Sequence, residues 1–570
     1  MHGQSIPVLH PFPGEIQLWW GKTAGGGERP RNLFGSSDRQ PNPDHMFRAG
    51  GSNGWISSGG VIADSNRDGL HRLVSELTRR IHEDPGPFVP NTGIPSGYTY
   101  LLQFIAHDMV DSVASFGIDG GQLCSRPSNA RSVPLMLDTL YGSGPDQSPQ
   151  AYAYRAQQQE LGRAPRTHLR LGPGAGPAPP GNRYCPFHDI ARSKPPDPLH
   201  EGSLFTEAML ADPRNDAHAL LSQLTVLFQR LHNHILSLVE KGTSSISSTP
   251  RELAYRRFRC ARLVVTMIYR NVIEKDVLCR ILDDRIYRHY VTNGNVPCDS
   301  AESIPLEFSF GAFRFGHSMV RENYNVNSRH ESQPVSGALL RSSQQQPALL
   351  PDMARWFIDW DRFFPEGATA TADRPFVPNF STMIGPRYLG ALHTGQVRSP
   401  GLDDKGLAWR DLLSACYAGV LSVAALCSAL RAMGFDMVKD FAWWREQLET
   451  WLPLPRANLF SASDDDTKRI VEDPPLPFFV LFEAERCGGG KHLGPVGSII
   501  VAETVLGAIK RHPLGLEQYA TLQERISRCG ESFFDESSAR TPVSMALSQI
   551  SEIETMPQLL EYMGRQGCFA

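Results

Sequence analysis

Long segments with helical spacing of apolar residues dominate this sequence and limit the folds open to it. Apolar residues recur at every third or fourth position, the period of one face of an α-helix, whereas the alternation typical of strands is scarce. The segments occupy residues 216–240, 251–283, 306–320, 407–434, 440–453 and 495–511, and a helical pattern begins at about residue 65. We therefore predict a mainly α-helical single domain with long loops, little β-structure and no internal repeat.

The first 64 residues form a different region. They are rich in Gly, Pro and Asn and lack periodicity, which predicts an irregular N-terminal arm at 1–64 before the domain at 65–570. The start of the chain has no charged stretch followed by an apolar one, so no secretory signal is visible. The ten cysteines are scattered without a CxxC motif. Both features predict a cytoplasmic protein with reduced thiols.

Composition excludes some partners. A net charge of −4 without a basic stripe argues against nucleic acid, and 41% hydrophobic residues suffice for a large core. Residues 412–430 carry no charge and are long enough to span a bilayer. Because this segment is rich in Ala, Ser and Cys and has no counterpart elsewhere, we predict a buried core helix instead of a transmembrane segment. No feature of the sequence indicates an oligomeric state.

The stretch QFIAHDM, residues 103–109, places Gln103 and His107 on an otherwise apolar segment. Residues four apart share one face of a helix, whereas Asp108 points elsewhere. A lone histidine on an apolar helix is usually a core residue, so this stretch alone leaves the role of His107 open.

A second stretch, residues 211–235, begins with the letters ADPRND. Asp212 suits a helix N-cap and Pro213 the first helical position. Arg214 would then lie at the positive end of the helix dipole, which is unfavourable unless it serves an anion. Two interpretations are open: an anion-binding arginine, or an exposed arginine or one that pairs with Asp216.

A third stretch, residues 306–327, places His317 directly after Gly316 in a segment rich in phenylalanine. Aromatic residues at this density usually form core. A glycine beside a histidine would also let a flat ligand approach closely.

Together, these stretches resemble the bacterial branch of the peroxidase–cyclooxygenase superfamily. IPSGYTYLLQFIAHD is similar to the segment that carries the histidine on the peroxide-binding side of the haem. ADPRND is similar to the catalytic arginine segment, and AFRFGHSMVR to the segment whose histidine binds iron. LMLDTLYG, FIDWDRFFP and LGPVGSIIVAET also match in order. The resemblance covers most of residues 92–511 and implies a single α-helical haem peroxidase domain.

The resemblance implies a role for each matching residue. His317 would be the axial ligand of the haem iron. His107 would transfer the proton of hydrogen peroxide, Gln103 would hold water, peroxide or a halide, and Arg214 would stabilise charge on the breaking O–O bond. The result would be a high-valent iron-oxo haem that oxidises an organic small-molecule substrate.

Three positions modify this picture. Arg314 would pair with a haem propionate, and it stands where the fatty-acid oxygenase branch has a radical-forming tyrosine, which argues against that reaction. Ala106 and Ala217 replace the carboxylates that form ester bonds to haem in relatives. The resemblance therefore implies non-covalent haem b, and chloride oxidation is not expected.

Asp411, in LAWRDLLSACYAG, stands where relatives have an asparagine bonded to the iron-binding histidine. Two readings are open. An anionic Asp411 would make His317 more electron-donating and lower the iron's reduction potential. Alternatively, Asp411 only caps the following helix.

The family's calcium site is only partly present. Asp108, Ser132, the carbonyl of Pro134 and Asp138 match its ligands, but Met136 replaces a carboxylate. Because a thioether is a poor calcium ligand, the sequence favours a degenerate site without calcium.

The sequence therefore predicts a haem peroxidase that uses hydrogen peroxide and a small-molecule reducing substrate. A tailoring enzyme of specialised metabolism has the same features. The alternative from another class is a haem-binding pseudoenzyme or sensor that kept the scaffold. The altered calcium and ester positions favour the alternative, whereas Gln103, His107, Arg214 and His317 favour the enzyme.

Overall fold

The computed structural model describes most of the chain beyond the predicted N-terminal arm. The described residues are 64–83, 88–111, 129, 131, 133–153, 166–174, 180–193, 207–244, 246, 249–295, 304–339, 355–366, 376–392, 406–418, 420–452, 464–534, 537–550 and 552–569. The arm at 1–64 therefore lies outside the described residues, apart from Asp64, where the first helix begins.

Helices make up most of the described structure, which confirms the predicted fold class. The α-helices are α1 (Asp64–Glu83), α2 (Gly97–Met109), α3 (Asp138–Tyr141), α4 (Ala219–Gly242), α5 (Pro250–Val272), α6 (Leu278–Ile281), α7 (Asp284–Tyr287), α8 (Val335–Leu339), α9 (Leu407–Ala418), α10 (Val423–Ala432), α11 (Phe441–Trp451), α12 (Asp464–Glu472), α13 (Leu476–Gly488), α14 (Pro495–Arg511), α15 (Leu522–Phe533), α16 (Ser537–Leu547) and α17 (Met556–Arg565).

The strands that the structure describes are short and pair in antiparallel twos. The pairs are β1 (Pro90–Pro95) with β8 (Phe380–Thr382), β2 (Tyr152–Ala153) with β3 (His168–Leu169), β4 (Leu171–Gly174) with β5 (His188–Ile190), and β6 (Asn323–Tyr324) with β7 (Gln333–Pro334). These two-stranded pairs connect loops, and among the described residues they do not form a larger sheet.

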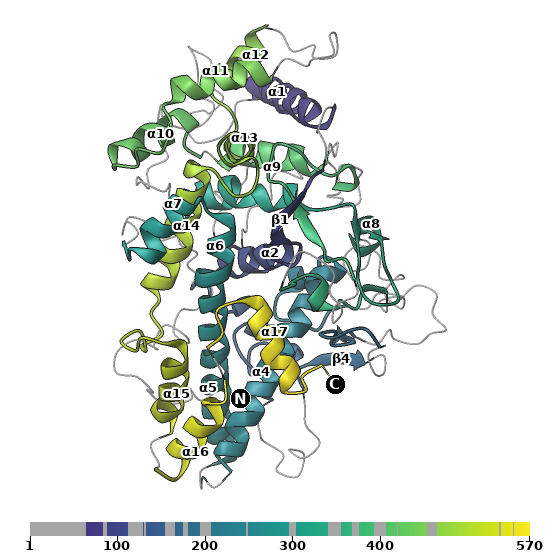
Figure 1. Ribbon diagram of the computed structural model, residues 1–570, viewed down its shortest axis with the longest axis vertical. Coiled ribbons are helices and arrows are strands. Elements are labelled where there is room, and N and C mark those ends of the chain that lie inside the picture. The colour runs from purple at the N-terminus through teal and green to yellow at the C-terminus, as the bar shows by residue number, and fades with distance from the viewer. Residues whose placement is uncertain are drawn as a thin grey trace.

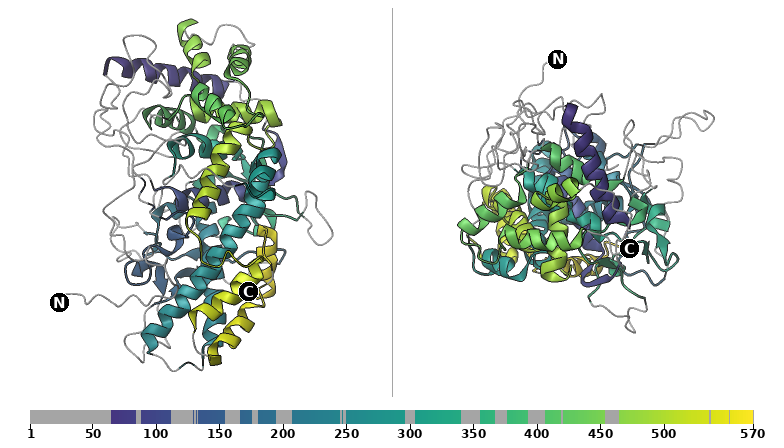
Figure 2. Two further views of the ribbon diagram at one scale, coloured as in Figure 1. Left: turned by 90° about the vertical axis from the view of Figure 1, so that its left-hand side faces the viewer. Right: turned by 90° about the horizontal axis from the view of Figure 1, so that it is seen from above.

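The molecule is elongated, with its longest helices along its length (Figure 1). Helices α1 and α9 to α12 gather at one end, and α15 and α16 pack beside α4 and α5 at the other, as a second direction of view also shows (Figure 2). Helix α2 lies between the two ends and packs against α4.

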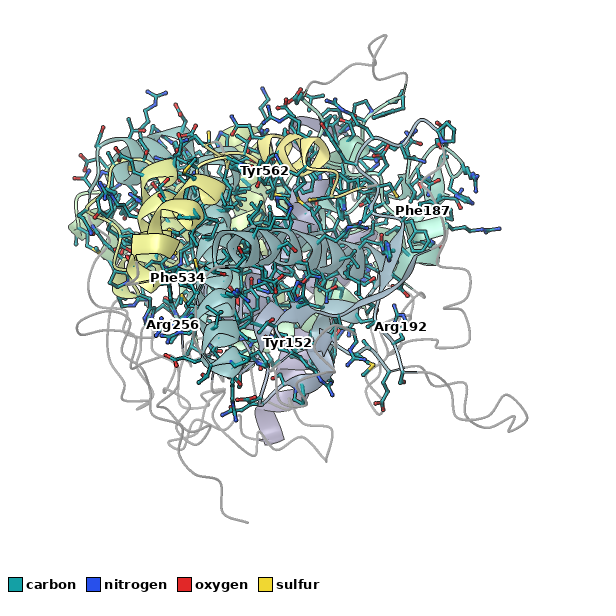
Figure 3. The ribbon with its side chains drawn as sticks, turned by 90° about the horizontal axis from the view of Figure 1, so that it is seen from below. Tyr152, Phe187, Arg192, Arg256, Phe534 and Tyr562 are labelled. Carbon is teal, nitrogen blue, oxygen red and sulfur yellow. The ribbon has the colours of Figure 1, made fainter. Side chains whose placement is uncertain are left out.

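Buried aromatic residues lock smaller elements onto the long helices. The hydroxyl of Tyr562, in α17, lies 3.0 Å from Nε2 of His234 in α4. The ring of Tyr152, in β2, packs edge-on against Phe258 of α5 at 5.7 Å. Tyr562 and Tyr152 lie on opposite sides of these helices when the molecule is seen from below (Figure 3).

Two predicted segments differ in detail. Residues 412–430 do not form one helix, because α9 ends at Ala418 and α10 begins at Val423. No helix within the described part of the chain is long and apolar enough to cross a membrane. Residues 306–320 form a π-helix, η7 (Glu307–Gly311), that continues as a 3₁₀-helix, η8 (Ala312–Met319), instead of an α-helix. The π-turn opens the backbone just before His317, a common feature of functional segments.

Candidate active site

One face of α2 stays uncovered inside a helix that is otherwise buried. Gln103, Ala106 and His107 are the residues of α2 that retain exposure, and they lie one turn apart on a single face. A 13-residue helix in the middle of a domain normally buries every face. Gln103 and His107 therefore lie on one face of α2, as predicted, and the surrounding described residues leave this face partly uncovered.

The start of α2 is fixed by the segment FIDWDRFFP. The backbone N–H of Gly97 donates to the carbonyl of Phe363 at 2.9 Å. A Cβ on Gly97 would lie 2.5 Å from the ring of Phe364, so no side chain fits at this position. The close approach sets the direction in which α2 runs, and with it the placement of His107.

Asn215 fixes the tautomer of His107. Nδ2 of Asn215 donates to the carbonyl of Thr139 at 3.2 Å, so its Oδ1 is an acceptor. Nδ1 of His107 lies 3.1 Å from that Oδ1 and must carry the proton. Nε2 of His107 is therefore unprotonated and available as a base. Burial, helped by the positive charge of Arg214, lowers the pKa of His107 to about 4 and keeps the ring neutral at pH 7.

His218 fixes the amide of Gln103 in a similar way. His218 is the N-cap of α4, and its Nδ1 accepts from the N–H of Leu221 at 3.3 Å. Its Nε2 therefore carries the proton and donates to Oε1 of Gln103 at 2.8 Å. Burial lowers the pKa of His218 to about 3, so it stays neutral. Gln103 thus has its NH₂ group left to offer a ligand.

Arg214 clamps the end of α2. Nη1 donates to the carbonyl of Val110 at 2.7 Å, and Nη2 donates to the carbonyl of His107 at 2.9 Å. Nε and Nη2 also contact Asp212, whose carboxylate accepts from the Arg214 N–H as the predicted N-cap. The partner is therefore Asp212 and not Asp216.

Asp216 forms a separate pair. Its carboxylate accepts from Arg192 at 2.7 and 3.0 Å, and its side chain is fully buried. The predicted helix at Pro213 is a 3₁₀-turn, η4 (Pro213–Asp216), and α4 begins only at Ala219.

His317 is bonded to the carboxylate of Asp411. Nδ1 of His317 lies 2.6 Å from Oδ2 of Asp411, which is 2% exposed. Asp411 lies inside α9 and not before it, so its carboxylate serves the histidine and not the end of the helix. With Nδ1 engaged, Nε2 of His317 is the nitrogen that remains for a ligand.

Two further side chains reach Asp411. The hydroxyl of Tyr388 donates to the same Oδ2 at 3.1 Å, and Nη1 of Arg314 lies 3.7 Å from Oδ1. Burial raises the pKa of the Tyr388 phenol well above its ordinary value, so it stays protonated. Nε of Arg314 donates to the carbonyl of Ser309, and a third of the side chain is exposed.

The surroundings of both histidines fit a flat cofactor. A Cβ built on Gly316 meets no atom within 4 Å, so there is open space beside His317. His317 is itself 34% exposed, although η8 packs against α2 and α13. On the α2 side, Ala106 adds only a methyl group to the uncovered face. These residues would accommodate the haem that the sequence resemblance implies.

The region of the implied calcium site holds protein donors. Both carboxylate oxygens of Asp108 accept backbone N–H groups, from Leu137 at 2.9 Å and from Thr139 at 3.3 Å. Asp108 is fully buried, and burial raises its pKa to about 6. The loop is tight, because Leu137 adopts a φ of 58°.

Two arginines of α5 lie among the other implied ligands. Nη2 of Arg262 donates to Oδ1 of Asp138 at 2.7 Å, and Nη2 of Arg270 lies 2.9 Å from the sulfur of Met136. Two guanidinium groups would repel a divalent cation, so this loop does not fit calcium. Ser132 lies outside the described residues. Elsewhere in the described ranges, no cluster of three or more acidic, histidine or cysteine side chains is arranged to hold a metal.

Sequence reasoning missed three residues of this site. Asn215 and His218 stand next to predicted residues in ADPRNDAH, but nothing in the spacing shows that their side chains turn towards α2. Tyr388 is separated from Asp411 by 23 positions and lies in no regular element that could be predicted. Only the fold brings these residues together.

Comparisons with known proteins agree with the arrangement. Residues 155–360 match the family model of the animal haem peroxidases, a range that contains Arg214 and His317. "Heme peroxidase 2" of Caenorhabditis elegans is 23% identical over 285 residues, which cover 44% of this chain and 38% of that protein. The chain thus matches less than two fifths of the length of this curated relative.

Solved structures show the same fold. Peroxidase A from Dictyostelium discoideum is similar with a TM-score of 0.50 at 14% identity, over 90% of this chain and 99% of that chain. A fatty acid alpha-dioxygenase of Arabidopsis thaliana is similar with a TM-score of 0.50 at 10% identity, over 95% and 83% of the two chains. The sequence matches and the shared fold together support the peroxidase–cyclooxygenase superfamily for this chain, with residues 155–360 similar to the animal haem peroxidases.

Proposed function

We propose that this chain is a haem peroxidase that reduces hydrogen peroxide and oxidises an organic substrate, with haem b held non-covalently between α2 and η8. One observation carries the proposal. His107 and His317 each donate from Nδ1 to a protein oxygen, so each presents Nε2 from a partly exposed face. The elements that carry them pack against each other.

The two acceptors differ in charge, which suits two different tasks. Asp411 gives His317 a carboxylate partner, which makes the ring a stronger ligand for ferric iron. Asn215 gives His107 a neutral partner, so the ring stays a neutral base. Haem, when bound, would supply the redox chemistry between peroxide and the substrate.

Around that chemistry, the chain's own residues move one proton and hold the reactants. Nε2 of His107 takes the proton from one peroxide oxygen and returns it to the other, which already carries a hydrogen and leaves as water. The NH₂ group of Gln103 donates to the bound peroxide. Arg214 adds positive charge beside His107, and Arg314 pairs with a haem carboxylate.

Non-covalent attachment follows from the residues near the uncovered face of α2. Ala106 and Ala217 have no carboxylate to esterify. The neighbouring carboxylates are occupied, Asp108 by two backbone N–H groups and Asp216 by Arg192. Axial ligation and packing would then hold the haem.

A second candidate function is a haem-binding sensor or pseudoenzyme. The contacts of Arg214 favour it, because Nε, Nη1 and Nη2 all donate within the protein. A peroxidase needs positive charge at the breaking O–O bond, and this guanidinium serves mainly to hold the end of α2.

Turnover, measured together with haem binding, distinguishes the peroxidase from the pseudoenzyme. Haem-loaded protein, hydrogen peroxide and an organic electron donor are expected to give sustained donor oxidation in the wild type, and none in His317→Ala. His234→Ala, which alters a histidine of α4 that contacts Tyr562 of α17, is the matched control and is expected to keep activity. Haem binding through His317 without turnover would establish the pseudoenzyme instead.

Denaturing separation tests the attachment. Acid–organic extraction is expected to remove all haem from the wild type. The double variant Ala106→Asp with Ala217→Glu, treated with peroxide, is expected to retain part of it. Wild-type haem that stays with the polypeptide would overturn the non-covalent assignment.

A further inference from the structure

Two arginines hold the same two acceptors at the end of α2. Nε of Arg131 donates to the carbonyl of His107 at 3.0 Å, and Nη2 of Arg214 donates to that carbonyl at 2.9 Å. Both guanidinium groups also pair with the carboxylate of Asp212. A carbonyl oxygen has two lone pairs and accepts both donors at once. Either arginine therefore joins α2 to Asp212 without the other.

The two arginines differ in burial. The side chain of Arg131 is 12% exposed, whereas that of Arg214 is 31% exposed. Asp212, their shared partner, is 5% exposed and brings one negative charge to two positive ones. Asp111 lies 3.8 Å from Nη1 of Arg214, but its side chain is 42% exposed, so water screens its charge. One guanidinium is thus in excess at this site, and Arg214 is the more accessible of the two.

The end of α2 has a further attachment that does not involve Arg214. Nδ2 of Asn129 donates to the carbonyl of Met109 at 2.9 Å, and its Oδ1 accepts from the N–H of Asp111 at 2.8 Å. The same Oδ1 accepts from the N–H of Arg131 at 3.1 Å, which fixes the backbone of that arginine. The remaining acceptor of Arg214 is the carbonyl of Val110, a half-buried residue that water can reach. The last turn of α2 would therefore stay in place if Arg214 moved.

We propose that Arg131 is a positioning residue that holds the end of α2 alone, so that Arg214 can leave its protein contacts and donate to the ligand bound beside His107. The inference rests on the proposed function, under which that ligand is peroxide. The protein contacts of Arg214 are then no obstacle to a role in the reaction, because Arg131 already serves the two acceptors that hold α2. A guanidinium that turns to the ligand brings its positive charge to the O–O bond that breaks.

Hydrogen exchange of the haem-loaded protein tests whether the two arginines duplicate each other. The backbone amides of residues 104–110 are compared in Arg131→Gln, Arg214→Gln and the double variant. Each single variant is expected to exchange close to the wild-type rate, because the other arginine still joins α2 to Asp212. The double variant is expected to exchange roughly tenfold faster, the effect of one lost charge-assisted hydrogen bond.

Ligand binding tests the role itself. Cyanide is the probe, because it binds ferric haem without turnover. In Arg131→Gln, Arg214 has to hold α2 alone, so cyanide should bind roughly tenfold more weakly although the amides of α2 keep their protection. Arg131→Lys keeps the positive charge, but one ammonium cannot bridge both acceptors as the planar guanidinium does. It is therefore expected to bind cyanide weakly too.

Arg257→Gln is the matched control. Nε and Nη2 of Arg257 clamp the hydroxyl and carbonyl of Thr243 at the end of another helix, α4. We expect this variant to bind cyanide as the wild type does and to leave the exchange of residues 104–110 unchanged.

Three results would overturn the inference: Arg214→Gln alone exposes α2 as much as the double variant, Arg131→Gln binds cyanide as tightly as the wild type, or Arg131→Lys restores the affinity in full. Weak cyanide binding in Arg131→Gln, together with a wild type that does not react with peroxide, would support the role of Arg131 and refute the proposed function. A wild type that reacts with peroxide, together with unchanged cyanide binding in Arg131→Gln, would support the proposed function and refute the role of Arg131.

Discussion

Nδ1 of His107 donates to the amide oxygen of Asn215 across 3.1 Å, and the NH₂ end of that amide is anchored on the carbonyl of Thr139. The amide therefore orients the ring and fixes its tautomer without adding charge. A carboxylate here would stabilise the imidazolium and hinder the return of the proton. His317 has a charged partner instead, the carboxylate of Asp411. The difference in charge suits His107 to act as a base and His317 to act as a metal ligand.

Removal of the amide should slow the reaction with peroxide. Asn215→Ala lets the ring turn and adopt the other tautomer, so we expect the rate constant for peroxide to fall roughly tenfold, the effect of about 1.4 kcal/mol and of one lost hydrogen bond. Asn233→Ala, which removes an amide bonded to the backbone of Leu169, is the matched control. Equal losses in both variants would mean that Asn215 matters only for stability.

The reaction with peroxide should depend on pH through His107. The neutral ring is the base, so the rate is constant at neutral pH and falls as the pH drops through about 4, the lowered pKa of this ring. Arg214→Gln removes a positive charge that lowers this pKa, so its profile should shift to higher pH. Rates measured after brief pH jumps give the profile. A wild-type inflection at the ordinary histidine value of 6.5 would contradict the lowered pKa of His107.

The charge of Asp411 should set the reduction potential of the iron. Asp411→Asn keeps an acceptor for Nδ1 of His317 but removes the negative charge, so the ferric state loses stabilisation and the potential rises. Tyr388→Phe keeps the carboxylate and should shift the potential less. Potentiometric titration of both haem-loaded variants decides the matter. If the potential of Asp411→Asn equals that of the wild type, the carboxylate does not act on the iron.

Calcium should not contribute to stability. Chelator or added calcium is expected to leave the melting temperature unchanged, because guanidinium groups hold the loop at residues 134–138. Arg270→Met leaves the buried carbonyl of Leu135 and the partly buried carbonyl of His512 without this donor and should cost about 1–3 kcal/mol.

The control for this prediction is Arg256→Met, which breaks a surface pair with Glu252 and should cost no more than about 1 kcal/mol. Denaturant unfolding measures both variants. A melting temperature that rises with calcium would show that the loop binds the ion after all.

The sequence was sufficient for the fold class. Helical spacing predicted α4 and α14 within a few residues, because amphipathic periodicity is a local property. The predicted segment 251–283 is divided in the structure into α5, a π-helical turn at Ile273–Val277 and α6. The placement of Gln103 and His107 on one face was also local, since residues four apart always meet on a helix.

Contacts between segments far apart in the chain could not be predicted from the sequence. The spacing of residues 306–320 looks α-helical, yet the chain forms a π-turn and then a 3₁₀-helix. The partner of Arg214 was predicted as an anion or Asp216, but Asp216 is drawn away by Arg192, a residue 24 positions earlier. Which of several carboxylates an arginine meets depends on packing that no local pattern encodes.

Rapid mixing of the haem-loaded protein with hydrogen peroxide tests the central claim, that His107 is the proton-transfer base opposite His317. The change in haem absorption gives the rate constant directly. We expect His107→Ala to slow this step by about 10²–10⁴-fold, the usual contribution of a general acid–base, with its ferric spectrum unchanged. His234→Ala should react at the wild-type rate. A His107→Ala variant that reacts as fast as the wild type would contradict the account.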